Sequence, residues 1–260
     1  MKAFQALLST KTPLGTWLMA AAPNTAEALG HAGLDFLVVD MEHVTIEFSD
    51  LAHIMRAIGC TPAVPVVRLA WADKVLVKRA MDAGAETLML PFIQTAEEAR
   101  EAVSFMRYPP HGVRGVAAVH RGSHFGTLPG YLAGAHERAF SILQLETPEA
   151  VANLDAIAAV EGVDALFVGP GDLSAAMGHI GDIGHKDVQN LLAHAAKAAA
   201  KAGKPVGIVG PNPTMVRRFL DYGYSFAAVS SDMGMMTSRA GEWLAELRHV
   251  QAPAAGQSAY

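Results

Sequence analysis

The sequence predicts an α/β fold, a (β/α)8 TIM barrel made by a single domain. Eight apolar segments of strand length alternate with amphipathic segments of helical length along the 260 residues. The apolar segments are rich in Val, Ile, Leu and Phe without alternating polar residues, as in strands that are covered on both faces. Eight such strands separated by helices over about 250 residues indicate a closed barrel. An open doubly wound sheet is the alternative.

The expected strands are Gly15–Ala20, Asp35–Asp40, Ala63–Arg68, Glu86–Pro91, Ser141–Glu146, Asp164–Gly169, Pro205–Gly210 and Phe226–Ser231. The expected helices are Asn24–Ala32, Ile46–Ile58, Ala72–Ala83, Thr95–Arg107, Pro148–Val160, Asp187–Ala202 and Thr214–Tyr222. Several of them end where a glycine suits a helix C-terminus. No Gly-x-Gly-x-x-Gly turn follows the first strand, which argues against a Rossmann dinucleotide site. Residues 1–250 are expected to form the domain, and residues 251–260, rich in Ala, Pro, Gly and Ser, a disordered tail.

One connection, Tyr108–Ala139, is much longer than the others. It contains Pro-Pro, several glycines and four histidines, which are His111, His120, His124 and His136. Loops of this length in compact domains are usually functional or disordered. The histidine spacings match no simple ligand pattern. A lid or a substrate-contacting loop is therefore favoured over a metal site.

Composition excludes several classes of protein. The net charge of −5, with no basic run, argues against a nucleic-acid partner. A single cysteine, Cys60, excludes an intrachain disulfide framework and a cysteine zinc cluster. No signal-peptide pattern and no apolar run of about 18 residues occur, so a cytoplasmic protein without a membrane partner is expected. The charged content of 17% is low and hints at an oligomer.

Polar and charged residues gather where four of the expected strands end. They are Asp40, Glu42 and His43 after the second strand, Arg68 at the third, Gln144 and Glu146 at the fifth, and Asp172 after the sixth. Each alone has a structural interpretation, such as Asp172 as a helix N-cap. Because the C-terminal ends of barrel strands meet over one mouth, their combination favours an active site.

These residues suggest a particular chemistry. Two carboxylates, Glu146 and Asp172, suit a hard divalent cation such as Mg²⁺, Mn²⁺ or Co²⁺, which can stabilise an enolate. Arg68 would stabilise the same oxyanion, and His43, with Asp40 three residues before it to orient the ring, would move protons. The turn from Gly169 to Asp172 offers backbone N–H groups to a carboxylate. No lysine lies at these strand ends, which disfavours a Schiff base.

The same residues resemble the metal-dependent pyruvate aldolases of the HpcH/HpaI family, from about Leu14 to Leu247. The resemblance rests on five motifs: Asp40-Met41-Glu42-His43, Pro65-Val66-Val67-Arg68, the segment 107–115, Gln144-Leu145-Glu146-Thr147 and the segment 161–174. It implies reversible aldol cleavage of 4-hydroxy-2-oxo acids to pyruvate and an aldehyde through a metal-stabilised enolate. It also implies a modified barrel that assembles as a homohexamer, with the last helix exchanged between neighbours.

The resemblance further implies residue roles. Glu146 and Asp172 would bind the cation, Arg68 would stabilise the enolate, and His43, oriented by Asp40, would be the base. Asp82 would support the histidine, within the chain or across a subunit boundary, and Gln144 would hydrogen-bond near the cation. The other substrate-binding positions that the resemblance implies are the backbone of Gly169, Gly171 and Asp172 and the apolar Val209. Two roles are open for Arg121 and Arg114, which would either bind a second carboxylate of the substrate or brace the long loop.

Substrate choice is left open by two departures from the family pattern. Val44-Thr45 follows His43 where relatives often have Ala-Pro, and Gly171 stands where they often have Ala or Ser. The segment 120–126 resembles the branch that cleaves 5-keto-4-deoxyglucarate, in sugar-acid catabolism. The branch that cleaves 4-hydroxy-2-oxoheptanedioate, in aromatic catabolism, is the other candidate.

Two other readings keep the same barrel. One is a phosphate-handling isomerase or an acyl-CoA lyase, although the loops after the seventh and eighth strands lack a Gly-rich cradle and Asp232 would repel phosphate. The other is a non-catalytic binder of 2-oxo acids, which would not need His43, Arg68 and two acids at one mouth. Metal-dependent release of pyruvate distinguishes an aldolase from both.

Overall fold

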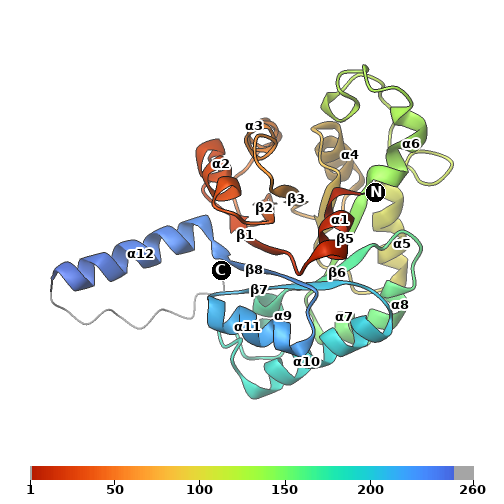
Figure 1. Ribbon diagram of the computed structural model, residues 1–260. Coiled ribbons are helices and arrows are strands. Elements are labelled where there is room, and N and C mark those ends of the chain that lie inside the picture. The colour runs from red at the N-terminus through yellow and green to blue at the C-terminus, as the bar shows by residue number, and fades with distance from the viewer. Residues whose placement is uncertain (1, 249–260) are drawn as a thin grey trace.

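The structure, a computed structural model, is a closed barrel of eight parallel strands in which each strand pairs with its neighbours in chain order (Figure 1). It describes residues 2–248, so the tail expected at 251–260 lies outside the described residues. The closed barrel confirms the predicted fold class and excludes the open sheet. Among the described residues, no helix is both long and apolar enough to cross a membrane. The cytoplasmic location stays a prediction.

Every strand lies within two residues of its expected bounds. The strands are β1 Leu14–Leu18, β2 Phe36–Asp40, β3 Val64–Arg68, β4 Thr87–Leu90, β5 Phe140–Leu145, β6 Ala165–Val168, β7 Val206–Gly210 and β8 Phe226–Ser231. The helices are α1 Ala3–Thr10, α2 Pro23–His31, α3 Phe48–Ile58, α4 Lys74–Asp82, α5 Ala96–Phe105, α6 Tyr131–Arg138, α7 Pro148–Ala152, α8 Leu154–Ala158, α9 Pro170–Ala176, α10 Lys186–Lys201, α11 Pro213–Tyr222 and α12 Asp232–Leu247, with a 3-10 turn, η1, at Arg121–Ser123.

Four helices, α1, α6, α9 and α12, were not among the expected helices, and one expected helix is divided. Helices α1, α6 and α9 are short, with no side-chain hydrogen bond at their N-caps, so the sequence carries little signal for them. The helix expected at Pro148–Val160 is interrupted at Asn153, whose side chain donates to the carbonyl of Gln94 at 2.8 Å. This bond ties the interruption to the connection that follows β4.

Helix α1 closes the N-terminal end of the barrel, which we call the base. Its Phe4 is fully buried, with its ring centroid 5.4 Å from Phe36, 5.4 Å from Phe140 and 5.2 Å from Phe226, each the first residue of a strand. Lys2 binds Asp164 at 2.6 Å just before β6 begins. With the base sealed, the opposite end, which we call the mouth, is the end where strand-end side chains can meet a ligand.

The long connection after α5 lies at the base. Helix α5 runs from the mouth back to the base, and β5 starts there, so the segment between them joins two base positions. Its Arg114 donates to Asp82, the last residue of α4, at 2.7 Å, and its Arg121 donates to the carbonyl of Ala83 at 3.0 Å. The expectation of a lid over the chain's own mouth is therefore wrong.

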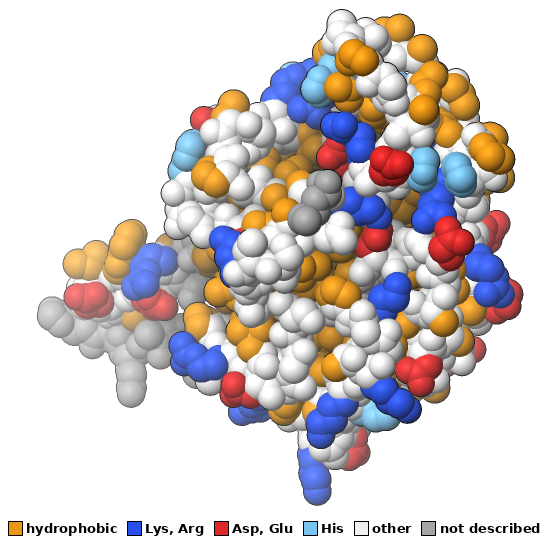
Figure 2. Space-filling model, turned by 45° about the vertical axis from the view of Figure 1, so that its right-hand side comes forward, with side chains coloured by type: hydrophobic (Ala, Val, Ile, Leu, Met, Phe, Trp, Pro, Cys, Tyr) orange, Lys and Arg blue, Asp and Glu red, His pale blue; other side chains and the backbone are white. Residues whose placement is uncertain are grey.

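Helix α12 leaves the end of β8 and extends away from the barrel, at the left of Figure 1. Its large apolar side chains remain exposed, with Met236 at 56%, Trp243 at 59% and Leu247 at 77%. Figure 2 shows hydrophobic side chains along this projecting segment. A monomeric protein rarely presents a contiguous apolar face of this kind.

Candidate active site

Strands β2 and β3 place a buried ion pair at the mouth. Their register sets Asp40 beside Arg68 at the last position of each strand. Arg68 donates from Nε to Asp40 Oδ1 at 3.0 Å and from Nη2 to Oδ2 at 2.8 Å, and both side chains are at most 1% exposed. A two-pronged bond of this kind fixes the plane of a guanidinium. Asp40 thus positions Arg68.

Asp40 also organises the turn that follows β2. Its Oδ1 accepts the backbone N–H groups of Glu42 at 3.0 Å and His43 at 3.4 Å. Asp40 therefore accepts hydrogen bonds that hold the backbone at His43, and the expected orientation of the His43 ring by Asp40 stays a prediction. The His43 side chain is 49% exposed and its Nε2 lies 3.9 Å from Glu42 Oε1. An imidazole in this position is open to a ligand at the mouth.

Strand β5 contributes a buried acid and amide. Gln144 Nε2 donates to Glu146 Oε1 at 2.6 Å, and the backbone N–H of Phe92 donates to Glu146 Oε2 at 3.0 Å. Glu146 is 1% exposed. Phe92 adopts a left-handed backbone with φ of 55°, a conformation that bulky residues rarely take and that is often found at functional sites. The strained turn after β4 thus supplies a hydrogen bond to the acid.

Like charges crowd the mouth. Burial first, and then the nearby carboxylates of Glu42 and Asp172, raise the pKa of Glu146 to about 8. Burial, with contributions from Asp40 and Asp172, also raises the pKa of Glu42, although Arg68 and His43 oppose the shift. Arg68 lies 2.8 Å from Glu42 as well as pairing with Asp40. One guanidinium therefore pairs with two carboxyl groups, Asp40 and Glu42, and opposes the pKa shift of a third, Glu146.

These residues fit a divalent cation. Asp172 lies close enough to Glu146 to raise the pKa of Glu146, and a cation bound by both residues would remove that penalty. Gln144 Oε1 is buried with no hydrogen-bond partner, whereas Glu42 Oε2 is paired with Arg68 Nη1 at 2.8 Å. A buried orphan oxygen beside two carboxylates suits a hard cation, which prefers oxygen ligands. Glu146 and Asp172, supported by Gln144, are the residues that would hold it.

Glycine at position 169 is required by close packing. A Cβ built there would lie 2.6 Å from Glu146 Oε1 and 2.9 Å from its Cγ. The Gly169 N–H donates to the carbonyl of Leu145 at 3.1 Å, so the expectation that it binds the substrate's carboxylate is wrong. Gly171 and Asp172 stand in the first turn of α9, where N–H groups have no carbonyl partner within the helix.

An apolar surface borders the charged groups. Val209, on β7, is 5% exposed and belongs to the cluster that fills the barrel interior, together with Trp17 and Phe167. The guanidinium carbon of Arg68 lies 5.4 Å from the centroid of the Trp17 ring. Val209 is thus placed to border a ligand at the mouth.

Two residues implied by the resemblance do not join this group within the chain. Asp82 is the last residue of α4 at the base, where it accepts from Arg114 and lies 3.7 Å from His120 Nε2. Arg121 also lies at the base, bonded to Ala83, and burial lowers its pKa. Arg114 Nε and Nη1 are buried there without hydrogen-bond partners. Residues at the base can reach a mouth only in a neighbouring chain.

Phe92 was missing from the predicted site residues, and Glu42 was expected at the mouth without an assigned role. Glu42 lies two positions after Asp40 in the same motif, so its sequence neighbourhood was the available signal. Phe92 contributes its backbone N–H to Glu146, and a role of the backbone cannot be predicted from the residue type. Asp232 is a third addition, since its carboxylate accepts the N–H groups of Met19 at 2.8 Å and Ala20 at 3.1 Å and fixes the end of β1.

Comparison with known proteins gives the family. The sequence model of the HpcH/HpaI aldolase/citrate lyase family matches residues 14–238. The chain belongs to this family. The HpcH/HpaI resemblance drawn from the five motifs is therefore confirmed, and with it the prediction of an enzyme of the aldehyde-lyase class that cleaves a 2-oxo acid to pyruvate and an aldehyde.

Similar members of the HpcH/HpaI family include curated aldolases and a solved structure. The chain is 56% identical to 2-dehydro-3,6-dideoxy-6-sulfogluconate aldolase of Pseudomonas putida over 95% of this chain and 97% of that one. It is 44% identical to 5-keto-4-deoxy-D-glucarate aldolase of Salmonella arizonae over 88% and 90%. A family protein from Burkholderia cenocepacia superposes with a TM-score of 0.92 at 39% identity, covering 95% of this chain and 100% of that one.

Proposed function

We propose that this aldolase acts on a six-carbon 2-oxo-3-deoxy sugar acid that carries a second anionic group at its far end. The names of both curated relatives describe such acids: a ketone beside one acid group, a neighbouring methylene, and a sulfonate or a carboxylate at the other end. Cleavage releases pyruvate and a three-carbon aldehyde that keeps the far anion. Of the two branches expected from sequence, the relatives favour sugar-acid cleavage over aromatic catabolism.

The observation that carries the proposal is the charge pattern at the mouth. Burial and, after it, neighbouring carboxylates that include Asp172 raise the pKa of Glu42 and Glu146, which lie near a single fixed guanidinium, Arg68. A bare acidic cluster would repel an oxo acid. Glu146 and Asp172 would hold a divalent cation, which would supply the positive charge that a carboxylate and its adjacent ketone require.

The chain's own residues account for the bond cleavage. His43, exposed at the mouth, takes the proton of the substrate's 4-hydroxyl, whose oxygen becomes the aldehyde carbonyl as the C3–C4 bond breaks. The electron pair of that bond remains on C3 as the enolate of pyruvate, and C3 then takes up a proton. Arg68, locked by Asp40, stabilises the enolate oxygen without having to reorient.

Other residues bind and exclude water. The first-turn N–H groups of Gly171 and Asp172 receive the substrate's carboxylate, and Val209 borders the aldehyde end. Gln144 holds Glu146 in place. The cation, of which Mg²⁺, Mn²⁺ and Co²⁺ are the candidates for an oxygen-rich donor set, supplies stabilisation of the negative charge that develops next to the carboxylate.

A hexameric assembly completes the proposal. The exposed apolar residues of α12 would be covered by a neighbouring chain, by exchange of this helix. Asp82 and Arg121, which lie at the base of their own barrel, would serve the mouth of a neighbour. Light scattering that gave the mass of a single chain at working concentrations would refute this part.

The experiment is pyruvate release, followed by a coupled dehydrogenase, from chelator-stripped protein with and without added Mg²⁺, Mn²⁺ or Co²⁺. The substrates are the sulfonated acid, the dicarboxylic acid and a matched acid, 2-dehydro-3-deoxygluconate, which ends in a neutral hydroxymethyl group. We expect release only with a cation, and kcat/KM at least about tenfold higher for an anionic far end.

Three results would count against the proposal. Pyruvate release that survives chelation would remove the cation from the mechanism. A neutral substrate that performs as well as both anionic ones would remove the far anion from the specificity. Absence of release from all three, with the protein folded and a cation present, would remove six-carbon 2-oxo-3-deoxy sugar acids as the substrate class.

A further inference from the structure

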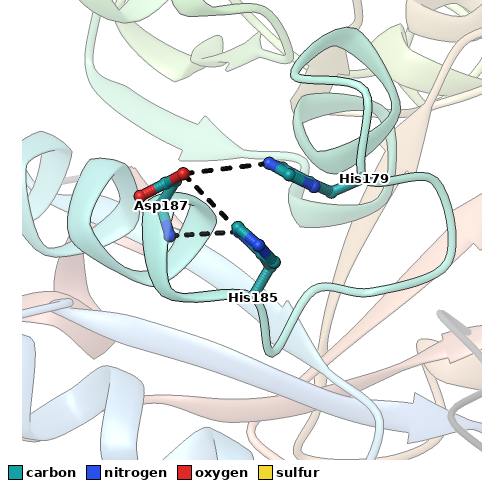
Figure 3. Close-up of side chains that lie close together, drawn as sticks. All are labelled: His179, His185 and Asp187. Atoms are coloured by element: carbon teal, nitrogen blue, oxygen red, sulfur yellow. Dashed lines mark hydrogen bonds and ion pairs between the residues drawn. The ribbon is translucent and has the colours of Figure 1, made fainter.

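A second group of ligating side chains lies between α9 and the start of α10. His179 follows α9, His185 caps α10, and Asp187 stands in the first turn of α10 (Figure 3). One ligand atom of each residue lies within 4.8 Å of the others, the one such group of three among residues 2–248. Asp187 Oδ2 is 4.0 Å from His179 Nε2 and 3.8 Å from His185 Nδ1. The two rings stack with centroids 3.5 Å apart.

The segment between the histidines is fixed by its own backbone. The N–H of Asp182 donates to the carbonyl of His179 at 2.9 Å, and the N–H of His185 donates to that of Asp182 at 3.1 Å. Ile183 is 5% exposed and anchors the segment to the protein. Asp187 donates its N–H to His185 Nδ1 at 3.3 Å. Both histidines are therefore held near Asp187 before any ligand arrives.

We infer that His179, His185 and Asp187 bind a borderline divalent cation of the Zn²⁺ type, with water in the remaining position. Two imidazoles and one carboxylate form a common ligand set for Zn²⁺, which suits nitrogen donors far better than Mg²⁺ does. The donor set differs from the all-oxygen set at the mouth, so the two sites would select different ions. The inference does not depend on the proposed aldolase substrate.

The distances allow one ion to be shared. A tetrahedral ion with bonds of about 2.1 Å holds its ligand atoms about 3.4 Å apart, so the present separations of 3.8 and 4.0 Å need to shrink by about half an ångström. The rings, inclined by only 17°, must turn apart so that both planes contain the ion, and His185 Nδ1 must exchange the N–H of Asp187 for the ion. The side chains of His179 and His185 are 29% and 36% exposed, which leaves them room to turn.

The chain contains a matched histidine pair that lacks the carboxylate. His111 and His136 also stack, with centroids 4.5 Å apart and an angle of 25°. Within the described part of the chain this pair belongs to no three-ligand group. Removing a histidine from either pair takes away one imidazole. Comparing the loss of cation binding between the two pairs therefore distinguishes a specific cation site from binding to ordinary surface histidines.

The test starts from the double variant Glu146→Gln/Asp172→Asn, which removes the proposed cation ligands at the mouth. We expect it to bind one equivalent of Zn²⁺ after gel filtration, measured by elemental analysis, and one equivalent of Co²⁺ with visible bands typical of imidazole ligation. Adding His179→Ala or Asp187→Asn should remove that equivalent, or weaken binding at least tenfold. Adding His185→Ser should do the same, because serine retains a capping oxygen for α10 but no imidazole.

The control is His136→Ala in the same background, which should leave one equivalent bound. Thermal unfolding of each variant establishes that it is folded. The inference is overturned if the double variant binds no Zn²⁺ or Co²⁺, or if His136→Ala lowers binding as much as His179→Ala. Because pyruvate release is not the readout, a failed aldolase assay and a failed binding assay remain distinguishable.

Discussion

The two ends of the barrel are built on opposite principles. At the mouth, Asp40 and Arg68 form a buried ion pair, and burial and the carboxylates of Glu42 and Asp172 raise the pKa of the buried Glu146. At the base, the Phe4 ring packs between Phe36, Phe140 and Phe226, and the nearby Lys2 is paired with Asp164. Burying unbalanced charge costs stability, whereas burying aromatic rings adds it. The comparison shows that the residues proposed for catalysis lie at one end of the barrel, whereas the aromatic residues that stabilise the fold lie at the other end.

The largest expected effect is at the mouth. Glu146→Gln or Asp172→Asn should lower pyruvate release by about a thousandfold or more, because loss of a cation ligand removes several kcal/mol of charge stabilisation. The melting temperature of the metal-free protein should stay the same or rise, because Asp172→Asn removes a carboxylate that raises the pKa of Glu146, and Glu146→Gln replaces a group that is already protonated below about pH 8. Steady-state kinetics and calorimetry measure the two effects.

The matched control is the exposed Glu149→Gln, three residues from Glu146, which should change neither quantity. Full activity in Glu146→Gln would show that the mouth does not need this carboxylate, and the proposed cation ligands would be wrong.

The opposite behaviour is expected at the base. Phe4→Ala should lower the free energy of unfolding by about 3–5 kcal/mol, because it empties a fully buried aromatic site. The kcat of the folded fraction should change less than about twofold. Urea unfolding and assays at low temperature measure these effects, with the exposed Gln5→Ala on the same helix as control. A large loss of kcat with little loss of stability would contradict the separation.

Arg68 should be an exception to this separation, because its substitution should lower both activity and stability. Arg68→Ala should lower kcat by about a hundredfold, as for loss of an oxyanion donor. It should also destabilise the protein by about 3–5 kcal/mol, because Asp40 is left buried without its partner. Arg68→Lys should recover part of the stability but less of the activity, since an ammonium lacks the fork that binds Asp40. Unchanged stability in Arg68→Ala would mean that Asp40 finds another partner.

The smallest effect concerns pH. The pKa of Glu146 is raised from 4.5 to about 8. The contribution of Glu146 to the free energy of unfolding of the metal-free protein is therefore most favourable below about pH 4.5, and it is lost as the pH rises through about 8. A cation needs the ionised form, so the Kd for Mn²⁺ should fall about tenfold per pH unit up to about 8 and then level off. Calorimetry in buffers of different ionisation enthalpy measures the proton released. A Kd that stays flat from pH 6.5 to 8 would contradict this.

The strands and the mouth were predictable because each buried parallel strand is visible in the sequence as an apolar run, and the end of that run marks a position at the mouth. Buried strands read as continuous apolar runs, and the residue just after each run lies at the mouth whatever the loops do. Asp40, Arg68, Glu146 and Asp172 follow from that rule alone. The pairing of Asp40 with Arg68 does not follow from that rule. It depends on the register between β2 and β3, which cannot be determined from a single sequence.

Other features left no such trace. Helix α1 has no capping side chain and a single fully buried residue, Phe4, so its role as a plug comes from rings supplied by three distant strands. The long connection was judged by its length, although its position between α5 and β5 already placed it at the base. The ring stacking of His179 and His185 arises from a turn between them that their spacing alone does not specify.

The plug at the base constrains how the chain can fold during its synthesis. Strand β1 pairs with β8, the N–H of Ala227 donates to the carbonyl of Pro13 at 3.0 Å, and Phe4 contacts Phe226. Helix α1 and strand β1 therefore leave the ribosome before β8 and cannot complete these contacts until β8 has emerged. Contacts that span this much sequence slow folding, and until they form, an open sheet has two unpaired edges that invite association. For this protein, the time between the emergence of β1 and of β8 is the interval in which a chaperone matters most.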